Sequence, residues 1–307
     1  MSSAEEDLVE QLRPAIFGIV YRMLGSVAAA EDVVQEALVR LHRALEAGER
    51  IESPRAYVAT LATRLAIDEL RSARVRREHY VGEWLPEPLV TDASDDPARH
   101  AEMADSLSLA FLVLLESLSP EQRAALLLRD VFDYGYDEIA KIIGKREANV
   151  RQLAARARRH VEQRRPRFES SRQQRDELAR RFLAAAQVGD LGALEALLAH
   201  DVELHGDGGG KVPALARPQK GRSRVARTLL AWMRQGARVV GASIRQVEIN
   251  GQPGALLLDG EGRVAGAWVL HIADGRVQSI SSIVNPDKLR HLGPVADLRA
   301  LLQRERS

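Results

Sequence analysis

The sequence predicts a multidomain protein in which two all-α domains precede one α+β domain. Apolar residues recur at helical spacing up to about residue 161, and a proline-rich segment interrupts them. Strand-like runs with Asn-Gly and Asp-Gly pairs between them occur only in the last third of the chain. We expect domains at 1–78, 101–168 and 169–307, with an extended linker at 79–100.

Composition limits the class of protein. The chain has 307 residues, of which 45% are hydrophobic, and its net charge is only +1, so any nucleic-acid-binding surface must be local. Cysteine is absent, which excludes disulfides and thiolate metal sites. The acidic N-terminus is unlike a signal peptide, and no apolar run approaches the ~20 residues of a membrane span. We therefore expect a cytoplasmic protein that does not bind membranes and needs no metal or cofactor.

Three helices are expected in the first domain. The first begins near residue 4 and ends before Gly25, with Pro14 marking a start or a kink. The second spans about 28–45. The third begins at Ser53-Pro54, where a capping serine precedes a proline in the first turn, and it continues to about residue 77.

The linker carries an isolated tryptophan. The stretch YVGEWLPEPLVTDASDDPAR contains three prolines and five acids and has no helical period, which indicates an extended segment. Trp84 has no local core to join. We expect Trp84, Leu85 and Pro86 to pack against another part of the protein or a partner.

The stretch YDEIAKIIGKREANVRQLAARARRHVEQ (136–163) predicts a helix-turn-helix. Ile139 and Ile142 give the first helix an apolar face, and Gly144 can adopt the left-handed conformation of a tight turn. Val150 and Ala154 lie on the inner face of the second helix. Its outer face is basic, and ten Lys/Arg stand against two acids between residues 141 and 167.

Side chains on that outer face suit DNA. Arg, Asn and Gln can pair with base edges in the major groove, and further basic residues suit phosphates. The alternative is an ordinary solvated helix with surface arginines. We expect the following residues to contact DNA: Arg146, Asn149, Arg151, Gln152 and Arg156.

The last domain is predicted to be α+β with a mostly antiparallel sheet. Helices are expected at about 172–188, 190–199 and 221–235, and strands at 202–205, 239–249, 255–258, 264–272 and 277–284. Asn250-Gly251, Asp259-Gly260 and Asp274-Gly275 are hairpin turn signals.

The glycine-rich stretch HGDGGGKVPA (205–214) is not a phosphate-binding loop. A Walker-type loop needs a glycine at position 205 and Ser or Thr at position 212, where this chain has His205 and Val212. The stretch instead predicts a tight turn after a strand. Catalysis would need a converging polar set such as His205, Asp207 and His271, and lone histidines on strands are more often packed or solvated.

The helical domains resemble a known family. SPEQRAALLLRDVFDYGYDEIA (119–140) with the helix-turn-helix looks like region 4 of a bacterial sigma factor, which reads the −35 promoter element. AEDVVQEALVRLHRAL (30–45) is similar to the region 2 helix that docks on core RNA polymerase. The resemblance implies polymerase contacts by four residues: Asp32, Val33, Gln35 and Glu36.

The third helix resembles the region 2 helix that melts and reads the −10 element. It departs from the family pattern where Tyr57-Val58 replaces Trp-Leu and Arg64 replaces Asn. An aromatic residue near its start and a basic end can hold a separated DNA strand by stacking and phosphate contact. The implied −10 contacts are Tyr57, Arg64, Asp68, Arg71 and Arg74.

Three short motifs resemble a subgroup of the extracytoplasmic-function sigma factors. They are WLPEP (84–88), DGGGK (207–211) and NPDKL (285–289). That subgroup carries a C-terminal SnoaL-like domain of the nuclear-transport-factor-2-like fold, a cone-shaped sheet with helices over a cavity. The resemblance implies a regulatory contact made by these residues: Trp84, Leu85, Pro86, Asp207, Gly208, Gly209, Gly210, Lys211, Asn285, Pro286, Asp287, Lys288 and Leu289.

The sequence is interpreted as a sigma factor, not an enzyme, whose C-terminal domain modulates its activity. Expected partners are core RNA polymerase and promoter DNA, and the free protein is expected to be a monomer. A small-molecule ligand or a protein regulator at the C-terminal domain stays open, with Trp232 and Trp268 as candidate cavity lining or as plain core. The alternatives are a ligand-responsive helix-turn-helix regulator and a cyclase- or isomerase-like enzyme fused to a DNA-binding unit.

Overall fold

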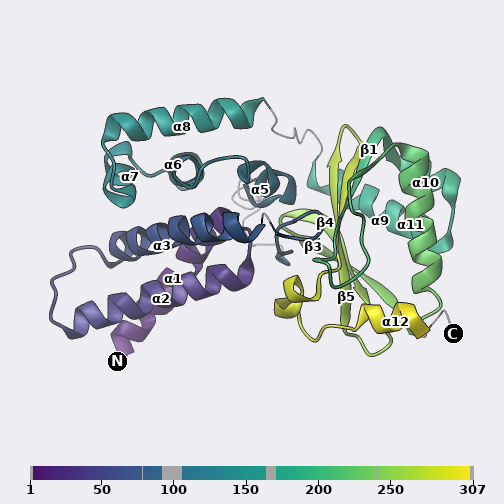
Figure 1. Cartoon of the computed structure of the whole chain (residues 1–307), viewed down its shortest axis with the longest axis horizontal. Coiled ribbons are helices and arrows are strands. Elements are labelled where there is room, and N and C mark those ends of the chain that lie inside the picture. The colour runs from purple at the N-terminus through teal and green to yellow at the C-terminus, as the bar shows by residue number, and fades with distance from the viewer. Residues whose placement is uncertain (1–2, 78, 92–105, 164–170, 240, 305–307) are drawn as a thin grey trace. The chain divides into compact units, whose positions relative to one another are not determined.

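The computed structural model describes residues 3–77, 79–91, 106–163, 171–239 and 241–304 (Figure 1). They form two compact units. The helical unit contains residues 1–78 and 112–165, and the sheet unit contains residues 79–111 and 166–307. Residues 79–91 and 106–111 thus belong to the sheet unit, although they precede the helix-turn-helix in sequence.

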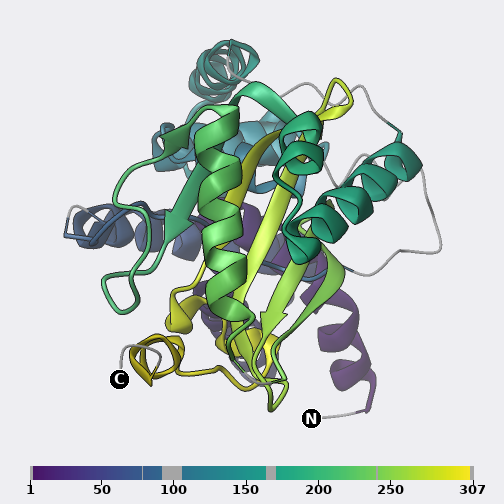
Figure 2. The ribbon, with the colours of Figure 1, turned by 90° about the vertical axis from the view of Figure 1, so that its right-hand side faces the viewer.

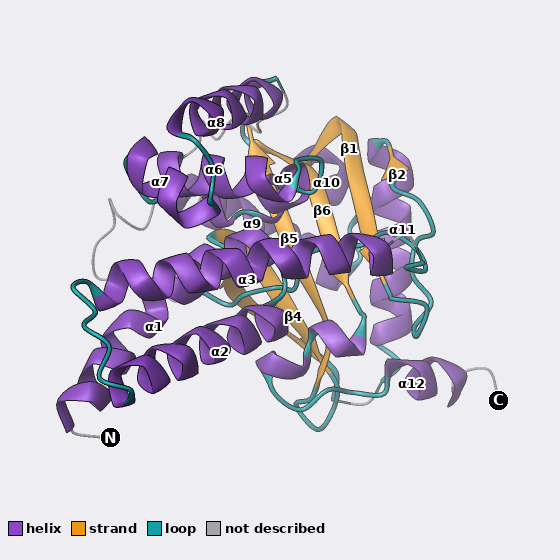
Figure 3. Ribbon diagram, turned by 60° about the vertical axis from the view of Figure 1, so that its left-hand side comes forward, coloured by secondary structure: helices purple, strands orange, loops and turns teal. Residues whose placement is uncertain are grey.

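Three long helices make up the first part of the helical unit. They are α1 (Ser3–Leu24), α2 (Val27–Glu46) and α3 (Pro54–Arg77), and they pack against one another (Figure 3). Gly25 has φ 66°, which ends α1, and Ser26 caps α2 by accepting a hydrogen bond from the Ala29 amide at 3.1 Å. Pro14 lies inside α1 and does not end it.

Shorter helices follow, namely α5 (Leu109–Leu115), α6 (Pro120–Asp130), α7 (Tyr136–Ile143) and α8 (Glu147–Glu162). Ser119 and Gln122 form a capping box at the start of α6, because each side chain bonds the other's backbone amide. Helix α6 packs against α8, and α7 packs against α8 and α3. The helix-turn-helix is therefore supported by the rest of the helical unit.

The sheet unit is built on a six-stranded sheet in the order β2-β1-β6-β5-β4-β3. Its strands are β1 (Leu198–Asp207), β2 (Gln219–Lys220), β3 (Ser243–Ile249), β4 (Gln252–Leu258), β5 (Val264–Ala273) and β6 (Arg276–Ile283). Strands β1 and β6 pair in parallel, and all the other pairs are antiparallel. The mostly antiparallel sheet expected from the sequence is confirmed.

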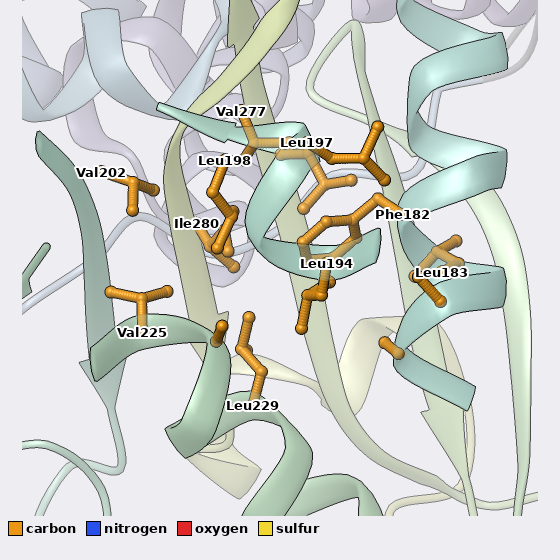
Figure 4. Packing of buried hydrophobic residues seen from close by; sticks show 14 of the residues in the cluster. Phe182, Leu183, Leu194, Leu197, Leu198, Val202, Val225, Leu229, Val277 and Ile280 are labelled. Atoms are coloured by element: carbon orange, nitrogen blue, oxygen red, sulfur yellow. The ribbon is translucent and has the colours of Figure 1, made fainter. Parts of the chain in front are cut away.

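Helices cover one face of this sheet (Figure 2). They are α9 (Arg172–Val188), α10 (Leu191–Leu197) and α11 (Arg222–Gly236). Figure 4 shows Phe182, Leu194 and Leu229 from these helices packed with Val277 and Ile280 from β6. This apolar layer holds the sheet and the helices together.

Several element boundaries differ from expectation. Strand β1 is longer than predicted, because pairing with β6 extends it in both directions. Strand β3 begins at Ser243, and left-handed Gly241 (φ 76°) lies just before it. Strand β2 and helix α12 (Leu298–Arg304) were not predicted, and each is very short. The described residues contain no helix that is long and apolar enough to cross a membrane.

Candidate nucleic-acid interface and linker contact

The helix-turn-helix has the geometry that its sequence predicts. Gly144 adopts φ 66° and ψ 37°, and its amide bonds the Ala140 carbonyl, so α7 ends in a left-handed cap. Ile139, Ile142, Val150 and Ala154 are buried. The turn and the two apolar faces together orient the outer side of α8 toward solvent.

All five predicted −35 residues are exposed: Arg146, Asn149, Arg151, Gln152 and Arg156. Arg151 is held in place, because its guanidinium lies 4.4 Å from the centre of the Tyr136 ring and donates to Glu147 Oε1 at 2.5 Å. Further along α8, Arg158 donates to Asp130, and this hydrogen bond raises the pKa of Arg158. The outer face of α8 thus carries permanent positive charge.

The predicted polymerase-docking residues lie on α2. Asp32, Gln35 and Glu36 are exposed, and Val33 is partly exposed. Glu36 accepts a hydrogen bond from Arg40 at 2.7 Å. The polar residues are therefore accessible, whereas the intervening Val34 is buried in the helical unit.

The predicted −10 residues on α3 have a different environment. Arg64 donates to the Ile142 carbonyl at 2.8 Å and to the Lys141 carbonyl at 2.9 Å, so it caps the C-terminal end of α7. Arg71 donates to Asp68 at 2.9 Å and to Glu121 on α6 at 2.7 Å. Tyr57 is partly exposed, and the side chain of Arg74 lies outside the described residues. Two −10 candidates are thus engaged by helices of the helix-turn-helix domain.

Two buried arginines at the same interface were missed by the sequence analysis. Arg123 on α6 is 2% exposed and donates to the Met23 carbonyl at 2.5 Å and to Glu116 at 2.9 Å. Burial lowers the pKa of Arg123 to about 9. Arg22 is 1% exposed and lies 5.4 Å from the centre of the Phe132 ring. Neither residue stands out in the sequence, because the Met23 carbonyl and the Phe132 ring reach these guanidinium groups only when distant helices pack.

In the sheet unit, Asp207 is the centre of the linker contact. Its carboxylate is fully buried and accepts hydrogen bonds from the Tyr80 hydroxyl at 2.5 Å and from the Leu85 amide at 2.8 Å. Lys288 forms an ion pair with it at 2.6 Å. Tyr80 and Leu85 belong to the linker, whereas Asp207 ends β1. Burial and the Asp207 hydrogen bond raise the pKa of Tyr80, so its hydroxyl keeps its proton.

Lys288 completes the same contact. Its ammonium group donates to the Leu85 carbonyl and lies 4.3 Å from the centre of the Trp84 ring. Only 7% of its side chain is exposed. The expected packing of Trp84 and Leu85 against the DGGGK and NPDKL motifs is therefore present, and Pro86 is buried beside them.

The glycines of DGGGK allow a close approach of the two motifs. Gly209 has φ 57°, and a Cβ on it would lie 2.2 Å from Asn285 Nδ2. A Cβ on Gly208 would lie 2.2 Å from the Val212 carbonyl oxygen. Asn285 donates to the Tyr80 hydroxyl at 2.9 Å, and Lys211 pairs with Asp287 at the exposed edge. Pro286 and Leu289 flank Lys288 in a 3-10 turn.

The linker continues along the edge of the sheet. The Asn250 side chain accepts from the Leu89 amide at 2.9 Å, and the Leu89 carbonyl accepts from the Asn250 amide at 2.7 Å. Glu83 bonds His205 Nδ1 at 2.8 Å. Burial opposes the charge on His205, but the Glu83 hydrogen bond and the carboxylates of Glu83 and Glu203 outweigh it, so the pKa of His205 is raised.

A cavity of about 650 Å³ lies in the sheet unit. Trp232 and Trp268 both line it, and their rings lie 6.5 Å apart. None of the three residues considered for catalysis belongs to its lining: His205 and Asp207 contact the linker, and His271 lies elsewhere on β5. Burial lowers the pKa of His271 to about 4, so it is neutral at physiological pH.

Two segments of the helical part of the chain match known families. Residues 8–76 match Sigma-70 region 2, and residues 108–161 match Sigma-70 region 4. The exposed basic face of α8 therefore belongs to region 4, and α2 and α3 belong to region 2. These matches define the class of protein as a sigma factor.

Whole-chain relatives make the class narrower. The chain is 38% identical over 302 residues to the ECF RNA polymerase sigma factor SigJ of Mycobacterium tuberculosis, covering 95% of each protein. It is 32% identical over 279 residues to the probable ECF RNA polymerase sigma factor SigI of the same species, covering 90% of this chain and 92% of that protein. The crystal structure of Mycobacterium tuberculosis SigJ matches with a TM-score of 0.72 and 34% identity, covering 92% of this chain and 96% of that one. The chain belongs to the extracytoplasmic-function RNA polymerase sigma factors, which act in transcription initiation.

Proposed function

We propose that this sigma factor docks on core RNA polymerase through α2, opens and reads the −10 element with α3, and reads the −35 element with α8. The exposed side chains of Arg146, at the N-cap of α8, and of the four predicted residues on α8 support the last role, because they are accessible to a major groove. The exposed acids of α2 support the first role.

The proposal includes an inactive arrangement of the helical unit. Arg64 and Arg71 bond to α7 and α6, so these guanidinium groups cannot hold a DNA strand at the same time. Release of the helix-turn-helix from α3 would free them. Such a change is a population shift between a closed and an open state.

The C-terminal domain regulates that shift by holding the linker between regions 2 and 4. The observation that carries this part is the buried ion pair of Asp207 with Lys288, which binds the backbone of Leu85 on both its amide and its carbonyl. A linker that is bound in this way cannot extend to let the two regions separate on a promoter. We propose a regulatory domain without catalytic activity of its own, and a monomer in the free state.

Run-off transcription with bacterial core RNA polymerase tests these roles, on a template that carries the gene's own upstream region. The wild-type chain is expected to co-purify with core and to produce a transcript. A Gln35→Ala/Glu36→Ala variant is expected to lose co-purification, whereas Glu46→Ala, at an exposed acid on the same helix, is expected to retain it. Wild-type protein that does not bind core would refute the docking role.

The regulatory role needs a separate comparison. Trp84→Ala removes the ring beside Lys288 and leaves regions 2 and 4 unchanged. We expect its transcript level to differ from that of the wild type at equal core occupancy. Equal transcript levels from both proteins would leave promoter recognition standing and refute regulation through the linker.

A further inference from the structure

The cavity of the sheet unit has the size of a ligand-binding site. Its volume of about 650 Å³ lies within the roughly 300–1,000 Å³ of small-molecule sites. Packed protein interiors, in contrast, contain few voids larger than a water molecule. A space of this size between α11, the sheet and α12 is therefore not an ordinary packing defect.

The lining indicates a mainly apolar ligand. Trp232, Met233, Ile244 and Leu257 line the cavity and are only partly buried, so they present apolar surface to its interior. Trp268 also lines the cavity and is 2% exposed. The two rings lie 6.5 Å apart at an angle of 42°, so they contact each other and together offer an aromatic surface on which a flat, conjugated ligand can stack.

Six lining residues have polar side chains, and three of them, Gln187, Ser243 and Arg299, are exposed to solvent. One of the buried ones offers a directed hydrogen bond. Ser282 is 3% exposed, and its Oγ accepts the Trp268 indole N–H at 3.2 Å. Because that oxygen is the acceptor in this bond, the hydroxyl proton can be donated to a ligand. Asp259 also lines the cavity, but it accepts from Arg263 at 2.8 Å and from backbone amides, so its charge is already compensated. Arg299, the other charged residue of the lining, is exposed to solvent, so the ligand is expected to be neutral and to carry an acceptor oxygen.

One wall of the cavity is shared with the linker contact. Gly206 and Val284 line the cavity, and they are the chain neighbours of Asp207 and Asn285. The Asp207 carbonyl accepts from the Val284 amide at 2.8 Å and from the Asn285 amide at 3.0 Å. A ligand that packs against this wall therefore contacts the backbone that positions the Asp207 carboxylate for the linker.

We infer that the cavity binds a neutral, mainly apolar aromatic molecule with a carbonyl-type acceptor, and that binding stabilises the docked linker. The binding itself requires neither DNA nor polymerase, whereas the coupling rests on the proposed regulatory role of the linker contact. Coupling between two sites is reciprocal, so weakening the linker contact must also weaken ligand binding.

Nile red, a neutral aromatic carbonyl dye, is the probe, and its fluorescence rise and blue shift are followed on the full-length chain. We expect saturable binding of one dye per chain. Ile244→Trp fills the cavity from β3 and is expected to weaken binding at least tenfold, whereas Ala184→Trp adds the same ring at an exposed position of α9 and leaves binding unchanged. Ser282→Ala is expected to weaken binding by about two- to tenfold, the value of one hydrogen bond.

Thermal unfolding of each variant shows whether it is folded, and Met233→Trp replaces Ile244→Trp if the latter unfolds early. The proposed ligand site would be refuted if the dye did not bind saturably, or if no cavity variant changed its binding. The coupling is tested by Trp84→Ala, which is expected to weaken dye binding several-fold. Wild-type dye affinity in that variant would refute the coupling but not the ligand site. Failure of the sigma-factor roles, in contrast, would appear only in the transcription assay.

Discussion

The linker contact and the outer face of α8 use the same kinds of charged residue in opposite ways. In the linker contact, 7% of the Lys288 side chain and none of the Asp207 side chain is exposed. On α8, 59% of Arg151 and 46% of its partner Glu147 are exposed. Burial makes the first pair part of the folded structure, whereas water leaves the second pair free to exchange partners.

The difference follows from the cost of removing charge from water. An exposed ion pair contributes about 0–1 kcal/mol, because water screens it and the side chains lose freedom. Breaking a buried pair by removing one partner costs about 3–5 kcal/mol, because the remaining charge has no compensation. The linker contact is therefore suited to hold a conformation, and the α8 face is suited to exchange protein partners for phosphates.

The largest expected effect is on the linker contact. Asp207→Ala leaves the ammonium group of Lys288 buried without its ion pair and is expected to cost about 3–5 kcal/mol of unfolding free energy, measured by urea denaturation. Arg290→Ala removes an exposed pair with Asp287 and is expected to cost at most about 1 kcal/mol. Equal losses in the two variants would mean that burial does not separate these pairs.

The second largest effect on stability is expected at Gly209, where the DGGGK motif closely approaches the NPDKL motif. Gly209→Ala combines a left-handed backbone with a Cβ that would lie 2.2 Å from Asn285, and we expect a loss of about 3 kcal/mol from strain and displacement of that side chain. Gly275 has φ 64°, and no atom of the described residues outside its own chain neighbours lies within 4 Å of where its Cβ would stand. Gly275→Ala is therefore expected to cost only about 1 kcal/mol. Urea denaturation measures both losses of unfolding free energy. Equal losses would mean that the Asn285 side chain moves aside at little cost and that the contact is looser than the distances imply.

A substitution on the outer face of α8 is expected to change the affinity for DNA without changing the stability of the protein. Gln152→Ala is expected to weaken binding to a −35 element by about 1–3 kcal/mol, if this side chain reaches a base edge. The unfolding free energy should change by no more than about 0.5 kcal/mol, because the side chain is exposed. Fluorescence anisotropy with promoter DNA and urea denaturation measure the two quantities, and unchanged DNA affinity would remove Gln152 from the reading surface.

The smallest expected effect is a pH dependence of the linker contact. The pKa of His205 is raised above its usual value near 6.5 in the folded state, so the bond with Glu83 is fully present below that pH and weakens as pH rises through the folded pKa. Amide hydrogen exchange at Leu85 should therefore be slower at pH 6 than at pH 8, after correction for the intrinsic rate.

His205→Gln is the matched variant for this measurement, and it should abolish the difference in protection. A local readout is needed, because His271 has the opposite effect on global stability. Its pKa is lowered to about 4, so the stability that it contributes is present above pH 6.5 and lost as pH falls. Persistence of the pH effect in His205→Gln would assign it to another group.

Much of the local structure could be predicted from the sequence. Ser26 and Ser119 cap their helices, Gly144 turns between α7 and α8, and Asn250-Gly251 and Asp274-Gly275 adopt positive φ values between strands. These features depend on neighbours within a few residues, so propensity and turn chemistry are enough to determine them. The same holds for the exposed basic face of α8, which follows from helical periodicity.

The sequence motifs predicted that the linker meets the segments 207–211 and 285–289, but only the tertiary structure decided which atoms bond to one another. The partners of Asp207 include Leu85, which is 122 residues away, and Arg123 bonds a carbonyl 100 residues away. No local pattern marks Tyr80, Glu83 or Arg22 for their roles, and the parallel pairing of β1 with β6 joins strands that are far apart in sequence. The contacts of Asp207 and Arg123 form only when packing excludes water around these charged groups, and burial of that kind is a property of the assembled fold and not of any segment.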